Sequence, residues 1–298
     1  MITAFMLRRR LAALGILAAL TVAGLGCGGG GGADASPATL RVGLVPNQEP
    51  DEVKAEYAPL AEYMERRLGM EVELVVPTGY PAVVEAMAND ELDLALFGGL
   101  TYVQARQRAQ VTPLVTDINP ETGTTKYDAS IIVSAASPVR RVEDLKGKTF
   151  AFGSVSSTSG SLNPALMLRK AGLDYRRDLG RTTYTGGHDA AAAAVASGKL
   201  EGGGLEGRIL RRLVKKGTVD GSKIREIAKS DPIEGYPWVV RDSVNPALKD
   251  RIARLFLDLR DPRLLKLLNA QGYERIEASD YSSVEQSAEE LGLLTRSK

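Results

Sequence analysis

The sequence predicts a two-lobed α/β protein, with a mixed sheet flanked by helices in each lobe and a hinge between the lobes. Short β-branched runs alternate along the chain with amphipathic runs, the pattern of sheets covered by helices. The 298 residues are enough for two domains of ordinary size. A new cycle of strands begins after Lys126, and residues 226–242 indicate a return crossing. We therefore expect residues 39–125 and 238–298 to form the first lobe and residues 126–237 the second.

The elements expected in the first lobe follow from hydrophobic periodicity. Residues 39–45 predict a strand by their β-branched content. Residues 51–69 predict a helix, because apolar residues recur every three or four positions and a glycine ends the run. A strand at 70–76 and a helix at 80–90 follow, with a proline in the first turn of that helix, where its missing N–H does no harm. Residues 92–98 predict a buried strand.

The second lobe continues this alternation. The runs "DASIIVSAA" and "KTFAFG" indicate strands, and "NPALMLRKAG" indicates a helix. The alanine run at 190–194 predicts a tightly packed helix, since alanine has the highest helix propensity. After the return crossing, "LKDRIARLFLDLRD" and "PRLLKLLNAQG" are helical, and residues 282–294, "SSVEQSAEELGLL", look like an acidic tail.

The amino terminus has the features of an export signal. A basic start, "MITAFMLRRR", precedes an apolar stretch that is too short for a typical membrane span. Cys27 follows directly in "GLGCGGGGG", which resembles a bacterial lipobox, so residues 1–27 predict a lipoprotein signal and residues 28–38 a flexible tether. The alternative is a plain secretory signal with an incidental cysteine. Either way we expect a protein of the periplasm or the cell surface, anchored there by lipid in the first case.

Composition excludes several classes of function. The net charge of +1 and the 5% aromatic content give no reason to expect a nucleic-acid surface. One histidine and one cysteine cannot build the usual zinc sites, and one cysteine cannot form a disulfide within the chain. We expect no metal, no cofactor and a monomer.

A hydroxyl-rich loop is the first candidate site. The stretch "FGSVSSTSG", residues 152–160, lies between a predicted strand and a predicted helix, and a helix start is a natural anion site. Ser157, Thr158 and Ser159 add uncharged donors, and Gly160 lets the backbone come close. The stretch lacks the phosphate-binding pattern of nucleotide-binding loops. Taken alone, a helix cap with a polar turn explains the stretch better than an anion-binding loop.

Three further loops have similar chemistry. "TGGHDAAAAAV" places the only histidine, His188, at a glycine-rich helix start, where imidazole can donate to an anion. Tyr80 follows a strand in "VPTGYPAVV", and Phe97, Gly98 and Thr101 occupy the same position in "LFGGLTYVQA". In open α/β sheets, loops at the carboxyl ends of strands converge on the binding crevice. The four loops together therefore predict an anion site.

From about residue 40 onward, these stretches resemble the PhnD-like substrate-binding proteins of ABC transporters for phosphonate, phosphite and phosphate, which belong to the type II periplasmic-binding-protein superfamily. The resemblance rests on "FGSVSSTSG", "TGGHDAAAAAVASGKLEGG", "GYPAVVEAMANDELDLALFGGLTYVQA" and "SDPIEGYPWVVR". It implies that Ser157, Thr158 and Ser159 bind the phosphonate oxygens. It also implies that His188 donates to the anion and that the Tyr80 hydroxyl contacts it.

Some positions depart from the best-known phosphonate-binding members. Phe97 stands where a tyrosine often supplies a hydroxyl, and Tyr236 stands where an acid can meet a ligand amine, which argues against an aminoalkylphosphonate. Glu206 is either a solvated surface residue or a carboxylate that accepts a hydrogen bond from a protonated P–OH group. Tyr127 and Trp238 are further candidates for the wall of the cleft. The expected ligand-binding set is Tyr80, Phe97, Gly98, Thr101, Ser157, Thr158, Ser159, His188, Glu206 and Tyr236.

The predicted function is capture of a tetrahedral oxyanion in a cleft between the lobes for import through an ABC permease of the inner membrane. The expected partners are therefore the oxyanion and that permease, with no nucleic acid. A ligand-sensing subunit of a membrane signalling system is an alternative with the same fold. A phosphate-ester hydrolase has less support, because the sequence has no G-x-S-x-G motif and a single histidine for acid–base work. We expect no enzymatic activity.

Overall fold

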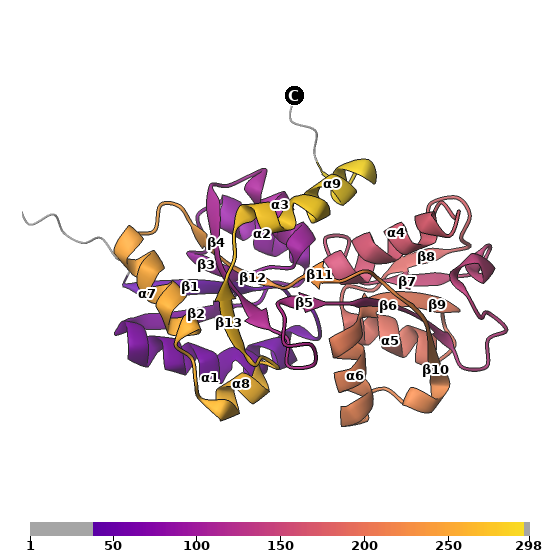
Figure 1. The fold of residues 1–298 in the computed structure, drawn as a ribbon, viewed down its shortest axis with the longest axis horizontal. Helices are drawn as coiled ribbons and strands as arrows, with labels where there is room; N and C mark the ends of the chain where they lie inside the picture. Colours follow the sequence, from indigo (N-terminus) through magenta and orange to yellow (C-terminus); the bar gives the residue numbers. More distant parts are fainter. Residues whose placement is uncertain (1–37, 295–298) are drawn as a thin grey trace, which may run out of the picture. The chain divides into compact units, whose positions relative to one another are not determined.

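The computed structural model describes residues 38–294, which contain two large mixed sheets (Figure 1). The first is six-stranded, in the order β13-β4-β12-β3-β1-β2. Strand β1 is parallel to β2 and β3, whereas β12 is antiparallel to β3 and β4, and β13 is antiparallel to β4. The strands are β1 (Thr39–Leu44), β2 (Glu71–Val75), β3 (Leu94–Leu96), β4 (Val111–Ile118), β12 (Pro237–Arg241) and β13 (Gly272–Arg275).

Helices packed on this sheet complete what we call the first lobe: α1 (Pro50–Leu68), α2 (Tyr80–Ala88), α3 (Gly99–Arg106), α7 (Pro246–Leu257) and α8 (Pro262–Leu267). The α1 helix begins with a proline and ends at Gly69, which adopts φ 67° and so provides the left-handed cap that favours glycine. An aromatic stack fills part of the core. The ring of Phe256 lies 4.7 Å from Trp238 and 5.0 Å from Tyr273, centroid to centroid.

The second lobe is built on a five-stranded sheet in the order β10-β6-β9-β7-β8. Its strands are β6 (Ala129–Ser134), β7 (Phe150–Phe152), β8 (Thr182–Tyr184), β9 (Gly202–Glu206) and β10 (Ile224–Lys229). Its helices are α4 (Asn163–Lys170), α5 (His188–Ala196) and α6 (Gly207–Lys216), with short turns η1 (Val142–Leu145), η2 (Thr158–Leu162) and η3 (Gly221–Lys223). The alanine run is helical as predicted. Buried alanines of α5 pack closely on the glycine-rich strand β9.

The chain passes between the two large sheets twice. Each passage contributes one strand to a small antiparallel sheet, in which β5 (Lys126–Tyr127) pairs with β11 (Ile233–Glu234) (Figure 1). This pairing agrees with the expected return crossing at 226–242. The lobe boundaries at 125/126 and 237/238, and the hinge, stay predictions.

The prediction of an acidic tail after residue 281 is wrong. Residues Ser282–Glu290 form helix α9, preceded by the turn η4 (Ala278–Tyr281), and α9 packs against α3 and η2. Val284 and Ala288 lie one helical turn apart and are buried, so the segment has an apolar face as well as an acidic one. Tyr281 at the helix entry is fully buried and donates a 2.8 Å hydrogen bond to the carbonyl of Gly235.

The predicted signal, Cys27 and almost all of the tether lie outside the described residues. Among residues 38–294 no helix is long and apolar enough to cross a membrane.

The aromatic stack gives a test of the first lobe. Replacing Phe256 with alanine removes a fully buried ring between Trp238 and Tyr273, and we expect the free energy of unfolding to fall by about 3–5 kcal/mol. Leu267→Ala, at a side chain that is 38% exposed, should change it by less than about 0.5 kcal/mol. Urea denaturation followed by circular dichroism measures both. Equal effects of the two substitutions would contradict this description of the core.

Candidate functional site

Five helical segments begin at, or directly after, residues selected from the sequence. They start at Tyr80 (α2), Gly99 (α3), Thr158 (η2), His188 (α5) and Gly207 (α6). No side chain caps α2, α3, α5 or α6. The first-turn N–H groups and the helix dipole make each start favourable for negative charge. The arrangement therefore suits an anion.

Short contacts bring these helix starts together. The Leu100 amide of α3 donates to Thr158 Oγ1 at 2.8 Å, which joins the first lobe to the second. On α5, the Nδ1 atom of His188 accepts a 3.3 Å hydrogen bond from the amide of Glu206, the residue that precedes α6. Tyr80 lies near the hydroxyls of Ser157 and Tyr236, which lower its pKa against the larger opposing effect of burial. All five starts therefore surround one region between the lobes.

The hydroxyl-rich loop folds tightly around two glycines. The Gly153 amide donates to the Gly160 carbonyl at 2.8 Å, and Ser157 Oγ accepts from the Gly160 amide at 3.0 Å. A Cβ atom on Gly160 would lie 2.9 Å from Ser157 Oγ and 3.1 Å from both the Cα atom of Gly153 and Cε1 of His188. Only glycine fits here without displacing backbone, as the sequence analysis expected of residue 160.

The helix after this loop begins earlier than expected. The sequence indicated a start at Asn163, but Thr158–Leu162 already form a π-helical turn that continues into α4. Ser157 caps this turn, since its side chain accepts from the Gly160 amide. A π turn is wider than an α turn and is frequent at functional sites. The cap and the anion loop, posed as alternatives by the sequence, are therefore the same residues.

Three buried polar atoms in this region have no hydrogen-bond partner among the described residues: Ser159 Oγ, His188 Nε2 and Tyr127 OH. Their side chains are 0%, 1% and 3% exposed. An unsatisfied buried donor costs about 1–3 kcal/mol, so native proteins rarely leave several together. Such a group of donors indicates a binding site. We call Tyr80, Tyr127, Ser157, Ser159, His188 and Tyr236 the donor cluster.

The protonation state of His188 follows from its contacts. Burial lowers its pKa below the ordinary value, although the negative charge of Glu206 opposes this. The imidazole is therefore neutral near pH 7. Because Nδ1 accepts the amide of Glu206, the single ring proton lies on Nε2, the atom that has no partner. His188 thus presents an uncharged donor to the cluster.

Tyrosine hydroxyls complete the cluster. Burial is the main cause of the raised pKa values of Tyr80, Tyr127 and Tyr236, and the negative charge of Glu206 is the next cause for each. All three therefore stay un-ionised. Tyr236 donates to Glu206 Oε2 at 2.8 Å, so its proton is already engaged. The hydroxyl of Tyr127 lies near those of Ser159 and Thr158 but has no hydrogen-bond partner of good geometry among the described residues.

Sequence reasoning missed Arg208. Its Nε atom donates to Glu206 Oε1 at 2.8 Å, and its Nη1 atom donates to Asp117 Oδ2 of the first lobe at 2.5 Å. These two acids raise its pKa well above the ordinary value although burial opposes them, and its guanidinium lies 5.1 Å from the Tyr127 ring centre. A basic residue in the first turn of a helix is unfavourable for the dipole. That signal could have indicated a buried acidic partner.

The other predicted residues have different surroundings. Glu206 is 3% exposed, so the solvated alternative is excluded. Gly98 packs against Tyr236 of the cluster and against Thr158, since a Cβ there would lie 3.9 Å from Tyr236 Cε1 and 3.2 Å from Thr158 Oγ1. The Thr101 hydroxyl donates to the Ser156 carbonyl at 2.8 Å and so joins the lobes directly. Phe97 is completely buried in the hydrophobic core. The roles of these residues in ligand binding stay predictions.

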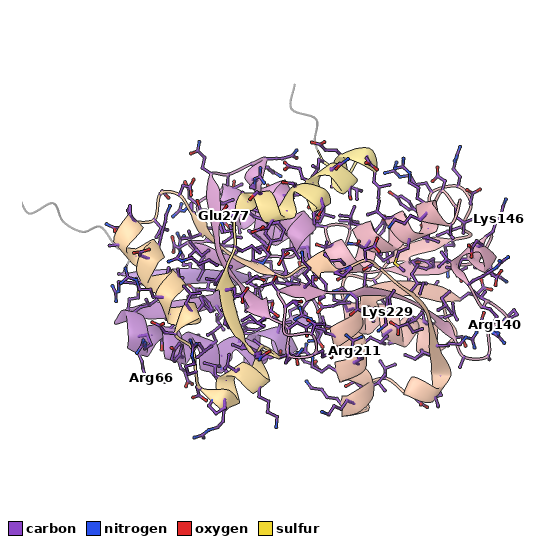
Figure 2. The ribbon with its side chains drawn as sticks, viewed as in Figure 1. Arg66, Arg140, Lys146, Arg211, Lys229 and Glu277 are labelled. Atoms are coloured by element: carbon purple, nitrogen blue, oxygen red, sulfur yellow. The ribbon has the colours of Figure 1, made fainter. Side chains whose placement is uncertain are left out.

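The donor cluster consists of uncharged side chains, whereas the surface carries exposed basic ones. Figure 2 shows Arg66, Arg140 and Lys146 on the outside of the protein, where each is exposed. Arg208 is buried beside the cluster, but acids on both sides engage it. Within residues 38–294, no three His, Cys, Asp or Glu side chains are grouped so as to hold a metal ion. The chemistry of the site is therefore hydrogen bonding by neutral donors.

A small cavity of about 60 Å³ adjoins the cluster at Glu206 and Tyr236. It lies between the lobes, with Asp117 on one side and Arg208 on the other. A cavity of this volume has room for about four water molecules. A ligand reaching into it from the cluster could therefore carry only a small substituent.

Comparison with known proteins identifies the family of this chain. A family model described as "ABC transporter, phosphonate, periplasmic substrate-binding protein" matches residues 42–281. The "Phosphate-import protein PhnD" of Mycolicibacterium smegmatis is 30% identical over 233 residues, which are 75% of this chain and 73% of that protein. The "Probable ABC transporter phosphite binding protein PhnD1" of Prochlorococcus marinus is 26% identical over 269 residues, 86% of this chain and 91% of its own.

The solved structure of PhnD1 from Prochlorococcus marinus in complex with methylphosphonate has the same fold. Its TM-score is 0.80 at 23% identity, and the match covers 86% of this chain and 99% of that one. The predicted two-lobed fold of the type II periplasmic-binding-protein class is therefore confirmed. Together with the family match over residues 42–281, it shows that this chain belongs to the phosphonate-binding, periplasmic substrate-binding proteins of ABC transporters.

Proposed function

We propose that this protein captures a tetrahedral oxyanion, namely a phosphonate, phosphite or phosphate, in the donor cluster between its lobes and delivers it to an ABC permease. One observation carries the proposal. Ser159 Oγ, His188 Nε2 and Tyr127 OH are buried, close to helix starts, and have no partner among the described residues. An oxyanion would accept from all three at once. The names of the relatives support this ligand class, since they refer to phosphate import, phosphite binding and a methylphosphonate complex.

Neutral donors can bind an anion without a basic side chain. Removing an ion from water is costly unless its hydrogen bonds are replaced, and hydrogen bonds to a charged group are about twice as strong as neutral ones. The cluster offers oriented hydroxyls, one imidazole N–H and the first turns of several helices. Cross-lobe contacts such as Leu100 to Thr158 and Thr101 to Ser156 would be made only when the lobes close on the ligand. Binding and closure are then one event.

The geometry of His188 favours binding over catalysis. A histidine that activates a serine accepts the serine proton at one nitrogen while a carboxylate orients the other. Here Nδ1 accepts a backbone amide and Nε2 carries the proton, so the imidazole presents no acceptor to the cluster. Burial also disfavours a second proton on the ring. We therefore propose that the protein is not a phosphate-ester hydrolase, and an assay with phosphate esters should show no turnover.

We further propose that the protein works outside the inner membrane, as a monomer, and that Cys27 anchors it through a lipid. Support comes from the export-type amino terminus and from the periplasmic family to which the chain belongs. Mass spectrometry of the protein from membranes would test the anchor. A diacylated Cys27 at the amino terminus is the expected result, and an unmodified cysteine would contradict it.

Calorimetric titration with phosphite, methylphosphonate, phosphate, sulfate and selenate tests the ligand class. Ser159→Ala should weaken binding of the preferred anion roughly ten- to hundredfold, because one hydrogen bond to a charged group contributes about 1.5–3 kcal/mol. His188→Ala should have an effect of the same order. Ser197→Ala is the matched control, since that exposed hydroxyl donates to Ala194 within its own helix. Unchanged affinity in both cluster variants would remove the site assignment.

The neutral state of His188 also predicts a pH dependence of stability without ligand. Its pKa in the folded protein is lowered, whereas the unfolded chain takes up the proton near pH 6.5. The free energy of unfolding should therefore fall as the pH drops below about 6.5, by at most about 1.4 kcal/mol per pH unit, and level off below the folded-state pKa. His188 is the only histidine, so His188→Gln removes this dependence. Urea denaturation of both proteins from pH 7.5 to 5.5 measures the difference, and parallel curves would refute the assignment.

A further inference from the structure

The Glu206 carboxylate faces the donor cluster. Its Oε2 atom accepts from Tyr236 and its Oε1 atom from Arg208, both at 2.8 Å. Burial is the largest cause of the raised pKa values of Tyr80, Tyr127 and Tyr236, and the negative charge of Glu206 is the second. Burial lowers the pKa of His188, and the charge of Glu206 is the largest influence that opposes this. Glu206 therefore lies close enough to the donor cluster to affect its residues electrostatically.

The surroundings of the cluster carry an excess of negative charge. Four acids and two arginines from both lobes lie around it: Glu56, Asp117, Asp189, Glu206, Arg208 and Arg212. Arg208 bridges Glu206 and Asp117, and Arg212 pairs with Glu56 at 2.8 Å. His188 and the tyrosines are neutral, as described above. A ligand with two negative charges is therefore opposed more strongly than a ligand with one.

Glu206 can also recognise a proton on the ligand. Each carboxylate oxygen has two lone pairs, so each retains one acceptor position after its bond to Tyr236 or Arg208. A protonated phosphoryl oxygen would donate to that position, whereas an unprotonated oxygen would be repelled. The ionised oxygens of the same ligand would accept from Ser159, His188 and Tyr127.

We propose, resting on the proposed function, that the protein binds its oxyanion together with one proton, shared between Glu206 and the ligand. The proton comes from water, and no bond to phosphorus forms or breaks. The ligand class is then a phosphoryl compound that can hold one proton in the site, such as phosphite, phosphate or a small alkylphosphonate. Sulfate and selenate, which carry no proton at neutral pH, are refused.

Proton uptake tests this directly on the unmodified protein. Phosphoryl groups lose their second proton near pH 6–7, so at pH 8 free phosphite is mostly doubly charged and has no P–OH proton left, whereas phosphate still carries one. Calorimetric titration with phosphite at pH 8 in two buffers of different ionisation enthalpy should show uptake of close to one proton per phosphite bound. The apparent affinity for phosphite should fall about tenfold per pH unit above its second pKa. Binding of phosphite without proton uptake would overturn the proposal.

Variants locate the proton. Glu206→Gln removes the charge, so uptake should fall well below one proton, and the preference for phosphate over sulfate should narrow at least tenfold. Glu121→Gln is the matched control, because it removes an exposed carboxylate paired with Arg211, which is labelled in Figure 2. Its uptake and preference should equal those of the wild type.

Two further outcomes are decisive. Full uptake that persists in Glu206→Gln would show that the proton is held without Glu206, on the ligand alone or on His188, and would overturn the role of Glu206. Sulfate bound by the wild type as tightly as phosphate at pH 8 would also overturn it. Failure of every oxyanion to bind would instead refute the proposed function, and this inference with it. Binding of phosphite with no proton uptake refutes the inference alone.

Discussion

The structure depends on the requirement that buried polar groups find hydrogen-bond partners. In the donor cluster the protein satisfies some of these groups internally and leaves other buried polar atoms without a partner within residues 38–294. Ser157 caps the π turn and Nδ1 of His188 accepts the amide of Glu206, whereas Ser159 Oγ and His188 Nε2 have no partner. The satisfied contacts hold the unsatisfied atoms in place. An anion is the complementary ligand, because every one of those atoms can donate.

The residues around the donor cluster also set the charge that a ligand would meet there. A buried cluster of neutral donors would accept singly and doubly charged anions alike, but Glu206 places a negative charge at its edge. Arg208 limits that charge by pairing with Glu206 and with Asp117, and the second pair joins the two lobes. In the proposed function, closure of the lobes and the electrostatics of the ligand site would both depend on this side chain, which lies outside the donor cluster.

The sequence predicted the local parts of this protein well. Strands, helices and the loops between them follow from periodicity and from glycine and hydroxyl content, which depend on neighbours in the chain. Loops after parallel strands were expected to converge, and Ser157, Ser159, His188 and Tyr80 do lie together. The last helix was wrongly predicted to be an acidic tail, because its apolar face is short and consists of Val284 and Ala288 in an otherwise acidic segment.

By itself, the sequence determined the fold class, the order of the elements and the chemical type of the site, since each rests on patterns among neighbouring residues. Only the tertiary structure decided how the site is charged. Asp117 and Arg208 are 91 positions apart and meet because the end of β4 lies against the start of α6 in the folded chain. The tautomer of His188 likewise depends on the amide of Glu206, 18 positions away. Contacts of this kind have no local signature, because the folded chain alone brings the two partners within hydrogen-bonding distance.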